Sequence, residues 1–332
     1  MMKHWKLYIA MLATALGFTA CNEQEDGIES NETCAVEFSI STKATATTDT
    51  VSKNQLMRLF VGERKPEHGV EELHLLGVME DVVQGHLTFN NLKPQWYKFA
   101  FVCVPRYPEL ELFTEENPGE ATCDMNRIMV DYEPILKLGA GSITPDIPIK
   151  DGNIYRKVVS LWLEKGKTAT EHVVLTRLNG QLILDMGILC DQFEHYVDSI
   201  VLELTNLPTR LYITDNDKDE IKITELKTVR FKTNPADQSE RLENERKHHK
   251  LIVNLLPCEL DGKIFVYTTA KNRVKEVFEF SLKTDTGQSF NIKRNTKTTL
   301  QFNGIYKGDF DVKYAGYDGT NIGVADDNWN GW

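Results

Sequence analysis

Cys21 is the residue whose type and position predict a chemical modification most directly. Lys3 and Lys6 open the chain, an apolar stretch covers residues 7–18, and two small residues stand directly before Cys21. This order of charged, apolar and small segments is that of a secretory signal peptide, and the apolar part is too short to span a membrane. A cysteine at this point is the lipoprotein variant, in which signal peptidase II cuts before the cysteine and the thiol carries a diacylglycerol. We therefore expect residues 1–20 to be removed and Cys21 to be acylated.

An acidic cluster follows the predicted lipid site. Glu23, Glu25 and Asp26 come shortly after Cys21, and this arrangement resembles the surface-export signal of Bacteroidetes lipoproteins; a solvated linker is the alternative. Two or three acyl chains give stable attachment to a bilayer. The sequence thus predicts a protein held in the outer membrane by its N-terminal lipid and facing the cell exterior. We assign residues 21–33 to an acidic linker.

The remaining cysteines offer thiol or disulfide chemistry. The chain has six cysteines, so acylation of Cys21 leaves an odd number, which requires at least one free thiol or an intermolecular bond. Cys103 and Cys123 bracket most of a loop-rich stretch at 105–126, and we consider them the disulfide candidates, with free buried thiols as the alternative. No C-x-x-C pair is present, so a thioredoxin-like or zinc-ribbon site has no support.

Charge and motifs argue against several other classes of chemistry. The formal net charge is −11, so the chain as a whole does not attract phosphate backbones and we expect no nucleic-acid partner. The sequence has no G-x-S-x-G, H-E-x-x-H or phosphate-binding glycine motif. Asp215 and Asp217 open like a calcium loop, but Glu220 and Leu226 stand where an EF-hand needs Gly and Glu. We expect no bound metal or cofactor.

Tryptophan rings can stack on sugar faces, and four tryptophans follow the signal peptide. Trp96 and Trp162 lie inside predicted strands, so we expect them in the core. Trp329 and Trp332 lie at the C-terminal end, where a pair of exposed rings is unusual for a simple tail. We predict that residues 310–332 help to join a neighbouring subunit through Trp329 and Trp332, with folding back onto their own domain as the alternative.

These side chains are carried by a series of short strands. Apolar residues at Cys34, Val36, Phe38 and Ile40 recur with a period of two, the pattern of a half-buried strand, and similar runs continue to residue 314. Turn dipeptides separate many of the runs, among them those at 90–91, 261–262 and 303–304. The sequence therefore predicts an all-β protein, with one sandwich domain at 34–167 and a second at 168–332.

The layout as a whole resembles the FimB/Mfa2 family, the fimbrillin-associated anchor proteins of Bacteroidales. The resemblance rests on the lipid cysteine, the acidic start, the strand Cys-Ala-Val-Glu-Phe-Ser-Ile at 34–40 and the stretch Thr-Arg-Leu-Asn-Gly-Gln-Leu-Ile-Leu at 176–184. It spans most of residues 21–332. It implies two transthyretin-like antiparallel β-sandwich domains in tandem. It also implies a protein that is not an enzyme and that holds a fimbrial stalk subunit of a type V pilus at the outer membrane.

The distribution of arginine bears on this implied role. Stalk subunits of the superfamily lose their first strand to proteolysis, often after Arg, and a neighbour's strand can fill the open groove. Residues 42–54 contain Lys43 and Lys53 but no arginine, which favours an anchor or cap that keeps strand 34–41. Two alternatives stay open: a surface lipoprotein that binds glycans for an outer-membrane uptake system, and a pilus tip adhesin.

Overall fold

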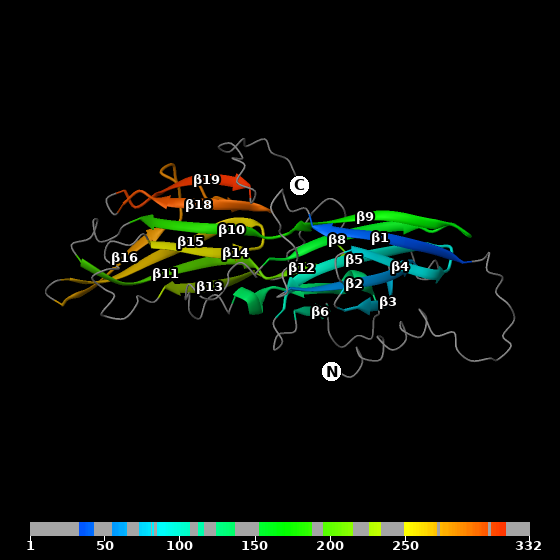
Figure 1. Ribbon diagram of the computed structural model, residues 1–332. Coiled ribbons are helices and arrows are strands. Elements are labelled where there is room, and N and C mark those ends of the chain that lie inside the picture. Colours follow the sequence, from blue (N-terminus) through cyan, green and yellow to red (C-terminus); the bar gives the residue numbers. More distant parts are fainter. Residues whose placement is uncertain are drawn as a thin grey trace. The chain divides into compact units, whose positions relative to one another are not determined.

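The described residues form strands almost throughout (Figure 1), which confirms the all-β prediction. The computed structural model describes residues 33–42, 55–64, 73–80, 82, 85–106, 112–115, 124–136, 153–187, 195–214, 226–233, 249–270, 273–304 and 307–316. The strands are β1 (Cys34–Thr42), β2 (Gln55–Arg64), β3 (Leu73–Met79), β4 (Gly85–Leu92), β5 (Trp96–Pro105), β6 (Phe113–Glu115), β7 (Ile128–Asp131), β8 (Tyr155–Trp162), β9 (Thr168–Arg177), β10 (Gly180–Gly187), β11 (His195–Pro208), β12 (Arg210–Tyr212), β13 (Leu226–Thr233), β14 (His249–Leu255), β15 (Cys258–Ala270), β16 (Lys275–Ser281), β17 (Phe290–Ile292), β18 (Thr296–Phe302) and β19 (Phe310–Gly316), and η2 (Met125–Arg127) is a 3₁₀ helix. Within these ranges no helix has the length and apolarity needed to cross a membrane.

The chain divides into two compact units, each built from several segments. The N-terminal unit comprises residues 1–130, 154–176 and 212–220, and the C-terminal unit comprises 131–153, 177–211 and 221–332. β9 pairs with β1, so it belongs to the N-terminal unit. After β9 the chain therefore passes to the C-terminal unit at Arg177 and not at residue 168, and residues 131–153 of the predicted N-terminal domain also belong to the C-terminal unit. The partner of Thr168 is Ala35, far away in the sequence, so no local signal marks this boundary.

Seven strands of the N-terminal unit form one sheet in the order β3-β2-β5-β8-β9-β1-β4. β2, β5 and β8 are antiparallel neighbours, whereas β1 and β9 run parallel. In a flat sheet β1 and β5, three positions apart, would be separated by about 14 Å. The ring of Phe38 on β1 nevertheless lies 4.8 Å from that of Phe99 and 5.1 Å from that of Phe101 on β5. The sheet therefore folds over, and β9-β1-β4 packs against β3-β2-β5-β8.

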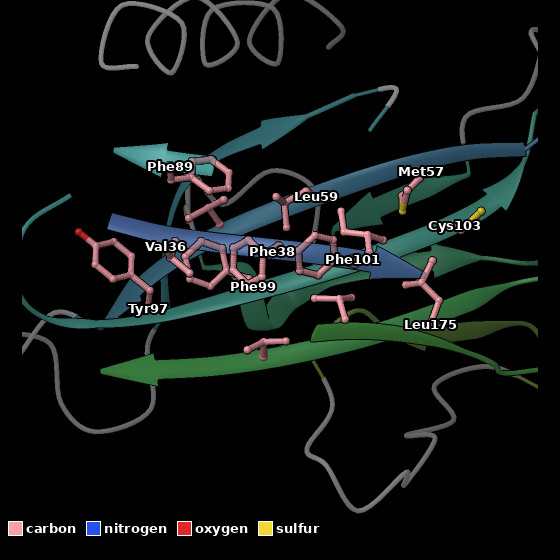
Figure 2. Packing of buried hydrophobic residues seen from close by; sticks show 14 of the residues in the cluster. Val36, Phe38, Met57, Leu59, Phe89, Tyr97, Phe99, Phe101, Cys103 and Leu175 are labelled. Carbon is pink, nitrogen blue, oxygen red and sulfur yellow. The ribbon is translucent and has the colours of Figure 1, made fainter. Parts of the chain in front are cut away.

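The core of this unit lies between the two halves of the folded sheet. Alternate residues of β5, namely Tyr97, Phe99, Phe101 and Cys103, are at most 4% exposed and point toward β1 (Figure 2). Alternation follows from strand geometry, in which successive side chains point to opposite faces. The period-two pattern predicted for β1 is confirmed, because Val36, Phe38 and Ile40 are all buried there.

A small layer covers part of the opposite face of β2. β6 pairs with β7, and η2 precedes β7. The ring of Phe113 on β6 lies 5.3 Å from that of Phe60 on β2. A Cβ added at Gly62 would come within 2.6 Å of Sδ of Met125 in η2, so glycine permits this close approach. The stretch 105–126, predicted to be a long loop, therefore contributes a strand to the fold.

The C-terminal unit contains two larger sheets. Their strand orders are β14-β10-β18-β19 and β13-β11-β15-β16, and β17 pairs with the start of β15. The ring of Phe280 on β16 lies 4.8 Å from that of Phe302 on β18, so the two sheets pack face to face as a sandwich. β10 and β18 are parallel, as are β1 and β9 in the N-terminal unit.

The predicted turns have mixed outcomes. Asn91 has φ 59° and Gly304 has φ 100°, values in the left-handed region that Asn and Gly adopt most readily. The turn predicted at 261–262 is wrong, because Gly262 lies inside β15. A Cβ there would lie 2.2 Å from the carbonyl oxygen of Glu203 on β11. Glycine at this position therefore allows β15 to lie close to β11. The chain turns instead at Pro257, between β14 and β15.

Candidate functional site

The first strand is held on both edges by its own chain. β4 pairs antiparallel with one edge of β1, and β9 pairs parallel with the other. The parallel register runs from Ala35 opposite Thr168 to Thr42 opposite Leu175, the full length of the strand. β1 therefore lies inside the seven-stranded sheet, with both of its edges paired.

Phe38 fixes the middle of β1 in the core. Its side chain is 0% exposed, and besides Phe99 and Phe101 it meets Phe89 of β4, with ring centroids 6.2 Å apart and planes at 81°. These edge-to-face pairs stabilise the contact beyond the burial of apolar area. Figure 2 shows the Phe38 ring among these neighbours. The inward face of β1 is thus a complete part of the core.

Backbone hydrogen bonds hold the start of β1 against the turn after β8. The N–H of Gly166 donates to the carbonyl oxygen of Thr33, and the N–H of Ala35 donates to that of Lys167, both at 3.0 Å. The Cys34 thiol lies 3.1 Å from the carbonyl oxygen of Leu92 and donates to it. Thr33, where the chain leaves the predicted linker, therefore has a fixed place in the N-terminal unit.

Trp96 and Trp162 are not in the core, so that prediction is wrong. Their exposed fractions are 45% and 51%. They face each other across β5 and β8 in register, with ring centroids 5.9 Å apart and planes inclined by 61°. Two large aromatic side chains thus lie together in contact with solvent at the end of two paired strands.

The alternation of side chains along β5 and β8 predicts that both rings point outward. Tyr97 and Phe99 point into the core, so Trp96 shares the opposite face with Lys98. On β8, Trp162 likewise shares its face with Ser160, which is exposed. A polar neighbour two residues away therefore predicts the outward direction better than the high apolar content of the segment.

The described thiols do not have the properties of nucleophiles. Burial raises the pKa of Cys103 and of Cys258 to about 12, and it also raises the pKa of Cys34, an effect partly offset by a backbone hydrogen bond. A reactive cysteine requires a lowered pKa and an exposed sulfur. Cys103 is a free, buried thiol here, and Cys123 lies outside the described residues, so their disulfide stays a prediction.

A metal site and a nucleophilic serine each place requirements on the polar side chains of the described ranges. These ranges contain no group of three His, Cys, Asp or Glu side chains that could hold a metal ion. Ser39 Oγ lies 3.0 Å from Nδ1 of His172, exposed on the surface of β1 and β9. A nucleophilic serine also needs donors placed for an oxyanion, so we interpret this contact as a hydrogen bond that joins two strands.

Several predicted site residues lie outside the described residues. They are the lipidation site Cys21, the export-signal residues Glu23, Glu25 and Asp26, and the proposed subunit contacts Trp329 and Trp332. The start of the predicted C-terminal arm is described. Residues 310–316 form β19, which pairs with β18 at the end of its sheet, and Phe310 is buried. The contact of residues 310–332 with a neighbouring subunit stays a prediction.

Comparisons with known proteins give similar folds at low identity. No protein-family profile matches the chain, and no curated protein matches its sequence. Among solved structures, the fimbrial anchor protein Mfa2 from Porphyromonas gingivalis aligns with 9% identity over 87% of this chain and 99% of that one, at a TM-score of 0.42. A fimbrial assembly protein from Parabacteroides distasonis aligns with 8% identity over 88% of this chain and 98% of that one, at 0.42.

A third structure is described as a candidate polysaccharide-binding protein from Bacteroides thetaiotaomicron. It aligns with 11% identity over 89% of this chain and 99% of its own, at a TM-score of 0.48. At these identities a fold does not determine a function, so a function must be argued from the residues of this chain.

Proposed function

We propose that this chain is an outer-membrane surface lipoprotein that anchors or caps a type V fimbria. Its lipid is carried by Cys21, and the acidic residues Glu23, Glu25 and Asp26 direct it to the cell exterior. Its partner is a fimbrial stalk subunit, bound by β-strand exchange. It has no catalytic role.

The observation that carries this proposal is the place of β1. In strand exchange, a subunit offers an open groove whose unpaired backbone groups accept a neighbour's strand. In this N-terminal unit that place is filled by residues 34–42 of the same chain, paired on both edges. A subunit whose groove is filled by its own first strand cannot accept a neighbour's strand there. Strand exchange between subunits would therefore end at this subunit, as it must at an anchor or cap.

The exposed tryptophan pair is an observation in favour of the glycan-binding alternative. Sugars pack their C–H faces on aromatic rings, and Trp96 and Trp162 present two rings to solvent. The planes of the rings are inclined by 61°, so they do not form one flat platform for a sugar chain. The closed first strand therefore supports the fimbrial role more strongly than the rings support glycan uptake.

The test of this proposal is to make the first strand removable. Lys43→Arg and Lys53→Arg give an Arg-specific protease a site in residues 42–54, which contain no arginine. In cells that express these variants together with such a protease, the cut leaves the lipid and β1 joined to the rest only by strand pairing and packing, and loss of β1 from the sheet should release the protein and its pili into the medium. The control is Lys157→Arg, the same chemical change inside β8.

A pull-down of the intact lipoprotein from outer membrane identifies the partner. Copurification of a fimbrial stalk subunit supports the proposal, and copurification of a glycan transporter without any pilin refutes it. Pili that stay on the cell after β1 has been cut away would show that this chain does not hold them.

A further inference from the structure

The exposed tryptophans lie at the end of the N-terminal unit where the lipid-bearing linker arrives. The N–H of Leu163, directly after Trp162, donates to the carbonyl oxygen of Gln95 at 3.0 Å, and Gln95 directly precedes Trp96. The turn that follows Leu163 is hydrogen bonded to Thr33 through Gly166. We call this group of residues, namely Thr33, residues 93–96 and residues 162–167, the tether end.

Cationic side chains gather around the tether end. Five cationic residues lie in it or next to it on β2 and β5, namely Arg64, Lys93, Lys98, Lys165 and Lys167. Two carboxylates of the described part of the chain lie among them, and both are engaged. Glu63 accepts a hydrogen bond from Gln95 at 2.5 Å, and Glu164 pairs with Lys167. The described residues of the tether end therefore have an excess of positive charge, in a chain whose formal net charge is −11 and whose acidic linker precedes Thr33.

The linker keeps the tether end close to the membrane. Twelve residue steps separate Cys21 from Thr33, since 33 − 21 = 12, and an extended chain spans at most about 3.5 Å per residue. The tether end thus stays within about 40 Å of the lipid headgroups. A tether of this length gives a high effective concentration of the membrane surface, so a contact too weak to form in solution can be populated.

We propose that the tether end docks on the anionic lipid surface that holds the Cys21 lipid. Trp96 and Trp162 enter the interfacial layer, where tryptophan has its apolar ring in a less polar region and its N–H in contact with water. Lys93 and Lys165 lie toward lipid phosphates, which attract cationic side chains near a bilayer surface. This inference rests on the proposed lipid anchor. It adds a second contact that sets the orientation of the N-terminal unit on the membrane.

Fluorescence of the lipidated full-length protein in vesicles tests the docking. Trp329→Phe and Trp332→Phe leave Trp96 and Trp162 as the only tryptophans of the mature chain. Vesicles contain phosphatidylcholine with about 30% phosphatidylglycerol, close to the anionic character of a charged leaflet, and carry brominated acyl chains that quench nearby tryptophan. We expect strong quenching of the pair.

The matched control places the fluorescent tryptophan at another position of β8. With Trp96, Trp162, Trp329 and Trp332 all changed to Phe, the change Lys157→Trp places a single ring at an exposed position of β8, five residues and about 17 Å from position 162. This ring should be quenched much less than the natural pair. Lys93→Ala and Lys165→Ala should each lower the ratio of docked to undocked protein about fivefold at low salt, and Lys157→Ala should leave it unchanged.

Three results would overturn the proposal. The first is equal quenching of the natural pair and of the ring at position 157. The second is quenching that is the same with and without phosphatidylglycerol. The third is a change in the fluorescence emission of Trp96 and Trp162 when a soluble oligosaccharide or pilin is added, together with no quenching in vesicles. This result would mean that the rings bind a glycan or a protein. Labelling with a fatty-acid probe and vesicle flotation report the lipid itself, so failure of the anchor is distinguished from failure of the docking.

Discussion

Truncation of Phe38 should destabilise the N-terminal unit more than any change on the outer face of β1. The side chain is 0% exposed and its ring meets three others. Phe→Ala changes in such cores cost about 3–5 kcal/mol, because apolar area is lost and a cavity stays behind. A domain has only about 5–15 kcal/mol of stability in total. Phe38→Ala should therefore remove a large part of the free energy of unfolding of this unit and loosen β1.

Urea denaturation measures this effect, with Glu37→Ala as the control. Glu37 is exposed on the same strand, so its removal should change the free energy of unfolding by about 0.5 kcal/mol or less. For Phe38→Ala the midpoint of one of two transitions should fall with little change in slope. A loss below about 1 kcal/mol would falsify the conclusion that β1 is an integral part of the core.

Three further outcomes test other parts of the molecule. Deletion of residues 328–332 should leave the melting temperature unchanged but detach pili, and a drop in melting temperature would indicate that Trp329 and Trp332 fold back on their own unit. Gly262→Ala should destabilise the C-terminal unit by about 2 kcal/mol in urea denaturation, because its Cβ has no room beside β11; an unchanged midpoint would contradict the close approach. Burial raises the pKa of Cys103 to about 12 in the folded protein, whereas an unfolded thiol titrates near pH 8.5. The free energy of unfolding should therefore fall between about pH 9 and pH 12, by up to about 1.4 kcal/mol per pH unit. The reference is Cys103→Ala, which lacks this thiol. Absence of this difference, with no reactive thiol at Cys103 after unfolding, would instead reveal the Cys103–Cys123 disulfide.

The fold class followed from the sequence because strand periodicity is a local property. Val36, Phe38 and Ile40 alternate with polar residues, and the structure buries these three. The boundary between the units was not predictable in the same way. It depends on the parallel pairing of β1 with β9. Parallel strands are joined by long connections, and their sequence does not indicate which strand will be the partner.

The candidate site was predictable only in part, for two different reasons. Cys21 and the acidic residues are recognised as short linear signals that processing enzymes read, so they appear in the sequence without any folding. The exposure of Trp96 and Trp162 is a property of the folded sheet. It follows from the direction of alternate side chains and from the limited extent of the layer formed by β6 and η2, which covers Phe60 but leaves Trp96 in solvent.

The parallel pairing of β1 with β9 predicts how the N-terminal unit would bear force in the proposed anchor. Tension would enter from the lipid at the start of β1, and Arg177 at the end of β9 is one of the points where the chain leaves for the C-terminal unit. Neighbouring parallel strands pulled at opposite ends slide along each other, so the hydrogen bonds between them are loaded together. Two strands pulled apart from the same end separate one hydrogen bond at a time.

Single-molecule pulling with two attachment geometries tests this mechanical role. Handles at Thr33 and Arg177 load the ladder between β1 and β9 in shear. Handles at Thr33 and Lys93 lie at one end of β1 and β4, where Cys34 stands opposite Leu92, and so peel these strands apart. The rupture force should be clearly higher in the first geometry at the same pulling rate. Equal forces would mean that the pairing of β1 with β9 does not resist tension, and the closed first strand would then have to be explained without a load-bearing role.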